Sequence, residues 1–359
     1  MKTQDIYNKI MINVSNSISD VLNENTAANK QNMIICPKEF KNVKNSWKVF
    51  LAGPIQGAEK WQFEMPYINN VIWLSPRRLN NDKTLFNYKD QVAWETHGLR
   101  MADVILFWIP EQVETIPGRQ YAQTTRFELG ENIARGKKII IGGYKDFPGM
   151  KYFKEKAKSY KNILGIYDNL DDCLDCLKDY IKDCKTHATT YFTSDNHFGA
   201  ERTLKFSNRP FSSVEDMDWT MIEKWNQKVH PGDDVYCLGD FGEQWPLQYL
   251  NGNITFIYGN YERDGKNEVI RKNFSDINKK PIIFEDYFLC HEPLTGKKYL
   301  KRHDDAKFCL FGHIHGSQRV KKFGLNVGVD CHNYAPISLE EVKFFRNAIE
   351  NHYDDEVFS

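Results

Sequence analysis

Four apolar runs in the first half of the chain alternate with segments of helical spacing. The runs end in glycine or proline, as a buried strand entering a loop does, and read WKVFLAGP, NVIWLSP, DVILFWIP and KKIIIGG. A strand that is apolar on both faces must be covered on both faces, which is typical of parallel sheets flanked by helices. The segments KDQVAWETHGLRMA and TTRFELGENIARG have the spacing of such helices. The pattern predicts an α/β domain with a doubly wound parallel sheet, flavodoxin- or Rossmann-like, over residues 46–187.

The pattern changes after residue 187. Short β runs follow one another, with one predicted helix at about 214–228, and most of these runs deliver Asp, Asn or His where the strand should end. A core needs no polar residues at strand ends, whereas a site built there does. We therefore predict a second domain over residues 188–359. Residues 1–45, rich in Asn and Lys, are predicted to be an N-terminal extension.

Charge and cysteine content narrow the class of protein. The 48 basic and 48 acidic residues cancel, so no overall field attracts an anionic membrane or an extended nucleic acid. The sequence shows no secretion-signal core and no membrane-length apolar run, and we expect a soluble cytoplasmic protein with a small-molecule substrate. The CxxC of Cys173 and Cys176 lies in a helix-like segment with no second CxxC, so we expect two half-buried helix residues.

The polar residues at the predicted strand ends form one set of nitrogen and oxygen donors. They are Asp195, His197, Asp240, Asn260, His291, His313 and His315. Seven donors exceed the four that one zinc ion takes, and they suit two divalent ions that share a carboxylate. A set of carboxylate, amide and imidazole without thiolate favours manganese, with iron or zinc as alternatives, over calcium or copper(I).

The order of these motifs, D-x-H, G-D, G-N, H and G-H-x-H, over residues 189–345 resembles that of the calcineurin-like metallophosphoesterases. The resemblance implies a four-layer α/β/β/α domain that hydrolyses phosphoesters with two metal ions. The first ion would be held by Asp195, His197, Asp240 and His315. The second would be held by Asp240, Asn260, His291 and His313, so that Asp240 bridges the two.

One position departs from that family's pattern. Tyr261 stands where the family usually has a histidine that assists the leaving group, and tyrosine is the weaker acid at neutral pH. We therefore expect diesters or activated esters to be better substrates than alkyl monoesters. A metal-binding domain without activity is the alternative. Arg209, in the stretch NRPF, is predicted either to contact a substrate phosphate or to be an ordinary surface residue.

Two acids stand out in the first domain. Glu128 lies at a predicted helix start, where the helix dipole favours an acid, and Asp103 lies between a helix and a strand. From spacing alone, both could be caps. However, the stretches VFLAGPIQG, YKDQVAWE, ADVILFWIP and TTRFELGENIARG resemble the nucleoside 2-deoxyribosyltransferase-like family over about residues 47–185. The resemblance implies that Glu128 attacks the anomeric carbon of a sugar and that Asp103 orients the sugar or the nucleophile.

The remaining site predictions follow from that chemistry. Cleavage of an N-glycosidic bond needs an acid at the leaving base, for which we choose Asp90, with Glu95 as the rival. The loop after the first strand is predicted to bind a sugar hydroxyl or a 5′-phosphate through Gly53, Pro54, Gln56 and Gly57. Trp61 is predicted to stack on the base or to be a core residue.

Together these features predict a bifunctional enzyme of nucleosides or nucleotides. One domain would cleave or exchange the base, and the other would hydrolyse a phosphoester. The alternative is a nucleotide-binding or sensing protein in which only the metallophosphoesterase domain is catalytic, or neither is. A nuclease is less favoured, because no basic, aromatic-rich tract is present. The resemblance of the first domain also implies a homo-oligomer formed through it.

Overall fold

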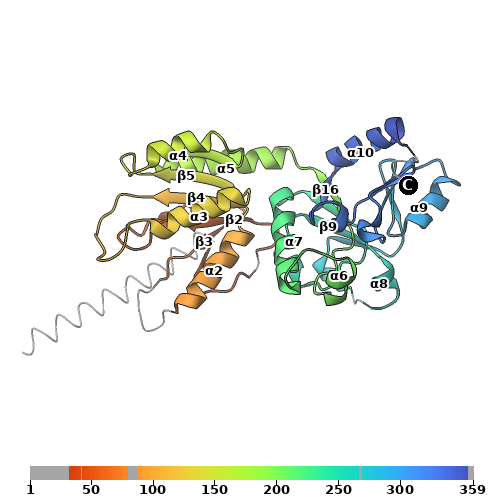
Figure 1. Ribbon diagram of the computed structural model, residues 1–359, viewed down its shortest axis with the longest axis horizontal. Helices are drawn as coiled ribbons and strands as arrows, with labels where there is room; N and C mark the ends of the chain where they lie inside the picture. Colours follow the sequence, from red (N-terminus) through yellow and green to blue (C-terminus); the bar gives the residue numbers. More distant parts are fainter. Residues whose placement is uncertain (1–31, 42, 80–86, 267–268, 355–359) are drawn as a thin grey trace, which may run out of the picture. The chain divides into compact units, whose positions relative to one another are not determined.

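The computed structural model describes residues 32–41, 43–79, 87–266 and 269–354 (Figure 1). The chain divides into two compact units, residues 1–182 and 183–359, each of which is described by itself. The domain boundaries predicted from the sequence, after residues 45 and 187, stay predictions. Most of the predicted N-terminal extension, residues 1–31, lies outside the described residues.

The first unit is built on a six-stranded sheet in which every pair of neighbouring strands is parallel, in the order β1-β3-β2-β4-β5-β6. The strands are β1 Met33–Ile35, β2 Trp47–Ala52, β3 Val71–Ser75, β4 Val104–Ile109, β5 Lys138–Gly143 and β6 Ile163–Tyr167. Within the sheet, the order β3-β2-β4-β5-β6 is that of flavodoxin-like doubly wound sheets, and β1 is an additional edge strand next to β3. The predicted parallel α/β architecture of this region is confirmed, and β2 and β3 are buried along their whole length.

Within the described residues, three helices and a short 3-10 turn connect these strands, and a fourth helix, α5, follows β6. They are η1 Trp61–Glu64, α2 Tyr88–Met101, α3 Gln123–Ala134, α4 Met150–Ala157 and α5 Leu170–Thr186. The connections through α2, α3 and α4 cross the sheet in one direction, and the right-handedness of such crossovers puts these three helices on one face. On α5, Cys173 is buried and Cys176 is half-buried, and both are free thiols. In the described part of the chain, no helix is long and apolar enough to cross a membrane.

The described residues of the second unit form two five-stranded sheets. The first has the order β10-β9-β8-β7-β16, with β7 Thr190–Thr193, β8 Asp234–Cys237, β9 Asn253–Ile257, β10 Asp276–Asn278 and β16 Ile337–Ser338. The second has the order β11-β12-β13-β15-β14, with β11 Ile282–Phe284, β12 Tyr287–Leu289, β13 Phe308–Phe311, β14 Val320–Lys321 and β15 Gly324–Asn326. The helices are α6 Glu201–Phe206, α7 Val214–Lys228, α8 Asn260–Arg263, α9 Pro293–Leu300 and α10 Leu339–His352.

One apolar cluster joins the two sheets of this unit. It includes Phe192 on β7, Leu310 on β13 and Ile349 on α10, all buried. Strands β7 to β10 are mutually parallel, as are β12, β13 and β15, so the carboxyl ends of each group meet at one edge of a sheet. The helix α7 has the bounds that the sequence predicts. The four-layer arrangement of a metallophosphoesterase stays a prediction.

Candidate metal centre and carboxylate site

The seven predicted metal ligands follow the carboxyl ends of five strands in the second unit. Asp195 and His197 follow β7, Asp240 follows β8 and Asn260 follows β9, while His291 follows β12 and His313 and His315 follow β13. Parallel pairing within each sheet brings these ends to the same edge, which explains why donors spread over 121 positions of sequence, Asp195 to His315 inclusive, converge.

The backbone at this edge adopts conformations that non-glycine residues rarely do. Five of the seven predicted ligands have positive φ, namely Asp195 at 57°, His197 at 51°, Asp240 at 55°, His313 at 74° and His315 at 50°. Such conformations cost on the order of 1–3 kcal/mol each and cluster at functional sites. This strain is an independent structural sign that the loops are shaped for their side chains.

Two glycines next to ligands are required by close approach. A Cβ atom on Gly259 would lie 2.2 Å from Asp240 Oδ1, and one on Gly312 would lie 2.1 Å from Ser194 Oγ and 2.4 Å from Asp195 Oδ2. The glycines of the G-N and G-H motifs therefore let neighbouring loops pack directly against the acidic side chains.

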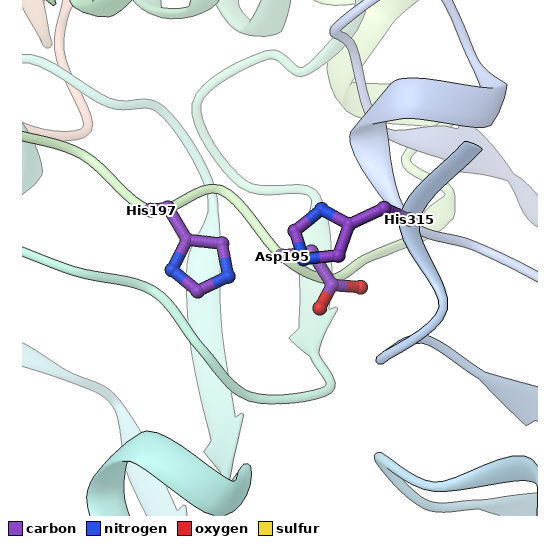
Figure 2. Close-up of side chains that lie close together, drawn as sticks. All are labelled: Asp195, His197 and His315. Carbon is purple, nitrogen blue, oxygen red and sulfur yellow. The ribbon is translucent and has the colours of Figure 1, made fainter. Parts of the chain in front are cut away.

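The side chains form two overlapping groups that can hold a metal ion. One ligand atom from each of Asp195, His197 and His315 lies within 4.8 Å of the others, and the same holds for Asp195, Asp240 and His291. Figure 2 shows the first of these groups. Asp240 Oδ2 lies 3.6 Å from His197 Nε2 and 3.5 Å from His291 Nε2, between two imidazoles as a bridging ligand would.

Asn260 and His313 join the same cluster. The amide oxygen of Asn260 lies 2.9 Å from His291 Nε2 and 3.0 Å from His313 Nδ1. The backbone N–H of His313 donates to Asp195 Oδ2 at 2.9 Å. The structure thus brings all seven predicted ligands together, while their division between two ions stays a prediction.

The electrostatics of the cluster fit a cation. Burial lowers the pKa of His197 to about 4, so this imidazole is neutral, and its Nε2 is buried with no hydrogen-bond partner in the described part of the chain. Burial alone would lower the pKa of His291, but its hydrogen bond to Asp240 and the charges of Asp195 and Asp240 raise that pKa to about 9. The negative potential that favours a proton on His291 favours a divalent cation as well.

Sequence reasoning did not single out a buried glutamate that supports this centre. Glu262 Oε2 accepts hydrogen bonds from the backbone N–H of Asp240 at 3.0 Å and of Gly259 at 2.9 Å. Its carboxylate therefore joins the loop after β8 to the loop after β9. Its place two residues after Asn260 in the G-N motif was the one available signal.

Arg209 does not lie where the phosphate-contact prediction needs it. Its side chain is 0% exposed, and its N–H groups donate to the Asp330 carboxylate, the carbonyls of Asp195 and Asn196, and the sulfur of Met217. A guanidinium with its donors already engaged and no exposed surface has none to offer a substrate. Arg209 is therefore an internal support, and neither the phosphate contact nor the surface alternative is supported.

Tyr261 lies directly beside the ligands. Its backbone N–H donates to Asp240 Oδ1 at 3.0 Å, and its ring packs edge-on against that of His197 with centroids 4.9 Å apart. Lys266 Nζ lies 4.9 Å from the centre of the tyrosine ring. The position fits a group that meets the substrate, and its role stays a prediction.

In the first unit, Glu128 lies on α3, and Glu95 on α2 is close enough to affect its ionisation. Burial raises the pKa of Glu128 to about 8, and the charges of Glu95 and Glu131 add to that rise. Glu95 accepts a hydrogen bond from Gln91 Nε2 at 2.8 Å, and Gln91 Oε1 accepts one from Arg78 Nε at 2.8 Å. Burial raises the pKa of Glu95 as well, although Gln91 and Arg78 oppose the rise.

The other two predicted acids lie elsewhere. Asp90 is exposed in the first turn of α2, where its backbone N–H donates to the Asn87 cap. Asp103 precedes β4, and its carboxylate accepts from the backbone N–H of Lys48 at 2.7 Å and pairs with Lys48 Nζ at 3.1 Å in a buried ion pair. Asp103 thus lies at the amino ends of the strands, whereas α3 starts beyond their carboxyl ends. Among the acids predicted from the sequence, Glu95 is the one whose charge contributes to the raised pKa of Glu128.

The predicted substrate loop, with Gly53, Pro54, Gln56 and Gly57, follows the carboxyl end of β2. The carbonyl of Gly57 accepts from Val113 N at 2.9 Å, and Gln56 Oε1 accepts from Arg119 Nη1 at 2.7 Å, so contacts with the segment after β4 fix this loop. Trp61 is 2% exposed and packs against Gly53. This burial agrees with the core alternative and leaves little of the ring surface for stacking on a base.

Comparison with known proteins identifies one part of the chain. Residues 46–147 match the family model described as nucleoside 2-deoxyribosyltransferase like, which confirms the assignment of this region. The chain is also 34% identical over 166 residues to an uncharacterized protein, MJ1445, of Methanocaldococcus jannaschii, a match that covers 42% of this chain and 86% of the relative. The chain belongs to the same family as that protein and carries a nucleoside 2-deoxyribosyltransferase-like domain.

Two further matches are more distant. The Gene 66 protein of Mycobacterium phage L5 is 26% identical over 184 residues, covering 40% of this chain and 87% of the phage protein. The crystal structure of a protein of unknown function, AQ665 from Aquifex aeolicus, is 21% identical with a TM-score of 0.36, and the match covers 44% of this chain and all of that one.

Proposed function

We propose that this chain is a bifunctional enzyme of nucleosides or nucleotides, with metal-dependent phosphoester hydrolysis in the second unit and N-glycosidic bond chemistry in the first. The observation that carries phosphoester hydrolysis is the convergence of five side chains into two overlapping donor groups. They are Asp195, His197, Asp240, His291 and His315. Two divalent cations there would stabilise charge on phosphoryl oxygens and lower the pKa of water.

The chain's own residues would define the geometry of that reaction. Asp240 lies between two imidazoles and fits a shared ligand. Tyr261, whose ring packs against that of His197, would be the group that meets the leaving oxygen. Because a phenol is a poorer proton donor than an imidazolium at neutral pH, we expect faster cleavage of diesters and activated esters than of alkyl monoesters.

The test is hydrolysis of bis-p-nitrophenyl phosphate by the full chain with Mn²⁺, with and without a chelator. Changing a residue that only supports a metal ligand typically costs about 10–100-fold in activity. Because Asp240 is proposed as a ligand itself, Asp240→Asn should lose more than that. The matched control is Asp286→Asn, which alters an acid paired with Arg346 away from the predicted ligands. Chelator-resistant hydrolysis, or full activity of Asp240→Asn, would contradict the proposal.

For the first unit, we propose Glu128 as the nucleophile and Glu95, in place of Asp90, as the group that protonates the leaving base. Glycosidic cleavage by a carboxyl pair needs one ionised and one protonated member. The charge of Glu95 contributes to the raised pKa of Glu128, so the two carboxyls are close enough to favour a single shared proton, which supports this pairing. The match of residues 46–147 supports a nucleoside as the class of substrate.

The test is release of free base from deoxynucleosides and their 5′-monophosphates. We expect release by wild type and by Asp90→Asn, and its loss in Glu128→Gln and Glu95→Gln. Binding of these compounds without any release of base would favour the sensing protein instead. Full release of base by Glu95→Gln, with loss of release in Asp90→Asn, would instead assign protonation of the leaving base to Asp90, as the sequence predicts.

A further inference from the structure

Two side chains outside the predicted ligand set hold the imidazole of His315. Asp330 Oδ2 lies 3.0 Å from His315 Nδ1, and Ser207 Oγ lies 3.1 Å from the same nitrogen. A carboxylate can only accept a hydrogen bond, so Nδ1 carries the proton. The lone pair for a cation is then on Nε2, and the tautomer of His315 is set by Asp330.

Arg209 fixes that aspartate in turn. Its Nε and Nη2 each donate at 2.9 Å to one oxygen of Asp330, which is the planar, bidentate geometry that lysine cannot reproduce. The same guanidinium donates to the carbonyl of Asp195 at 2.6 Å and to that of Asn196 at 2.8 Å. The buried guanidinium of Arg209 therefore joins Asp330 to the loop that carries Asp195 and His197.

His291, on the other side of the cluster, is held differently. Its Nδ1 lies 2.8 Å from the carbonyl oxygen of Leu238, and no interaction links it to Arg209 or Asp330 in the described part of the chain. The imidazoles of His315 and His291 thus have separate supports, while Asp195 is common to both groups.

We propose that Arg209 and Asp330 are positioning residues that set the cation affinity of the group Asp195, His197 and His315 without setting that of the group around His291. The inference rests on the proposed function, because it needs cations to bind at this cluster. It also gives Arg209 a role that the sequence did not predict.

The experiment titrates the full-length protein with Co²⁺, followed by visible absorption, and repeats the titration with Mn²⁺ by calorimetry. In Asp330→Asn, we expect one of two binding steps to weaken by about 10–100-fold with a changed absorption band, and the other to stay within about threefold. Arg209→Lys, which keeps the charge but loses the bidentate hydrogen bonds to Asp330, should weaken the same step. These are binding and spectroscopic measurements, independent of turnover.

The matched control is Asp286→Asn. Asp286 accepts from Arg346 Nη1 at 2.8 Å and Nη2 at 3.0 Å, so this variant also removes a carboxylate from a bidentate pair, but away from the ligands. It should alter the melting temperature and leave both binding steps unchanged. If Asp330→Asn does not fold, Ser207→Ala weakens the same single step through the other contact of His315 Nδ1.

The outcomes separate this inference from the proposed function. Two unaltered binding steps in the folded Asp330 or Ser207 variant, or equal weakening of both, would overturn the positioning role while leaving the metal centre intact. A wild-type chain that binds neither cation would overturn the metal centre and the inference with it.

Discussion

The raised pKa of Glu128 gives the sharpest prediction, because it connects burial, stability and activity. The pKa rises from 4.5 to about 8, chiefly through burial. The folded protein therefore binds a proton that the unfolded chain releases between these two pH values, and its stability must fall as pH rises through that window. At about 1.36 kcal/mol per pH unit, the loss approaches about 5 kcal/mol above pH 8.

The perturbation is Glu128→Gln, which keeps the shape and removes the titration. We expect the variant to gain stability relative to wild type as pH rises from 4.5 to 8.5, and no difference of that size at the acid end. The assay is urea unfolding at several pH values, with the exposed Asp90→Asn as control. A stability difference between Glu128→Gln and wild type that stays constant across this range would refute the burial argument.

The same shift predicts how base release depends on pH. With a pKa of about 8, only about one tenth of the Glu128 side chains are ionised at pH 7. If the ionised form is the nucleophile, kcat/KM for base release should rise with pH to a midpoint near 8. Glu95→Gln removes a like charge and should move the pKa of Glu128 down, which the pH dependence of urea unfolding would show in a variant that no longer releases base. A profile that falls over this range would show that Glu128 works as the acid instead.

Three further predictions concern single residues. Tyr261→His should raise the monoester-to-diester rate ratio by about tenfold or more, because it supplies a better acid to the leaving oxygen; an unchanged ratio would count against this role. Gly312→Ala should lower Mn²⁺ affinity at least tenfold in calorimetry, since its Cβ would lie 2.1 Å from Ser194 Oγ and force the loop away; wild-type affinity would contradict the packing argument. Lys48→Met should destabilise the fold by about 3–5 kcal/mol in urea unfolding by removing the buried ammonium group that pairs with the Asp103 carboxylate, and adding Asp103→Leu should recover most of the loss.

Local patterns in the sequence determined the architecture of the first unit and the composition of the metal cluster. Strands that are apolar on both faces require a covered sheet, so their alternation with helical segments could be read directly, and the helix at 214–228 could be read from its spacing. The donors could be read because a polar residue at the end of a buried strand is conspicuous against its surroundings.

The tertiary structure decided which acid lies near Glu128 and which buried carboxylate Arg209 binds. Asp90 and Glu95 are five residues apart and so lie about 140° apart around α2, and only the folded positions of α2 and α3 decide that the charge of Glu95 affects Glu128. Arg209 and Asp330 are separated by 121 positions, and nothing local announces their pairing. Periodicity reports which side of an element is buried, whereas the partner that each buried charge meets depends on how distant elements pack.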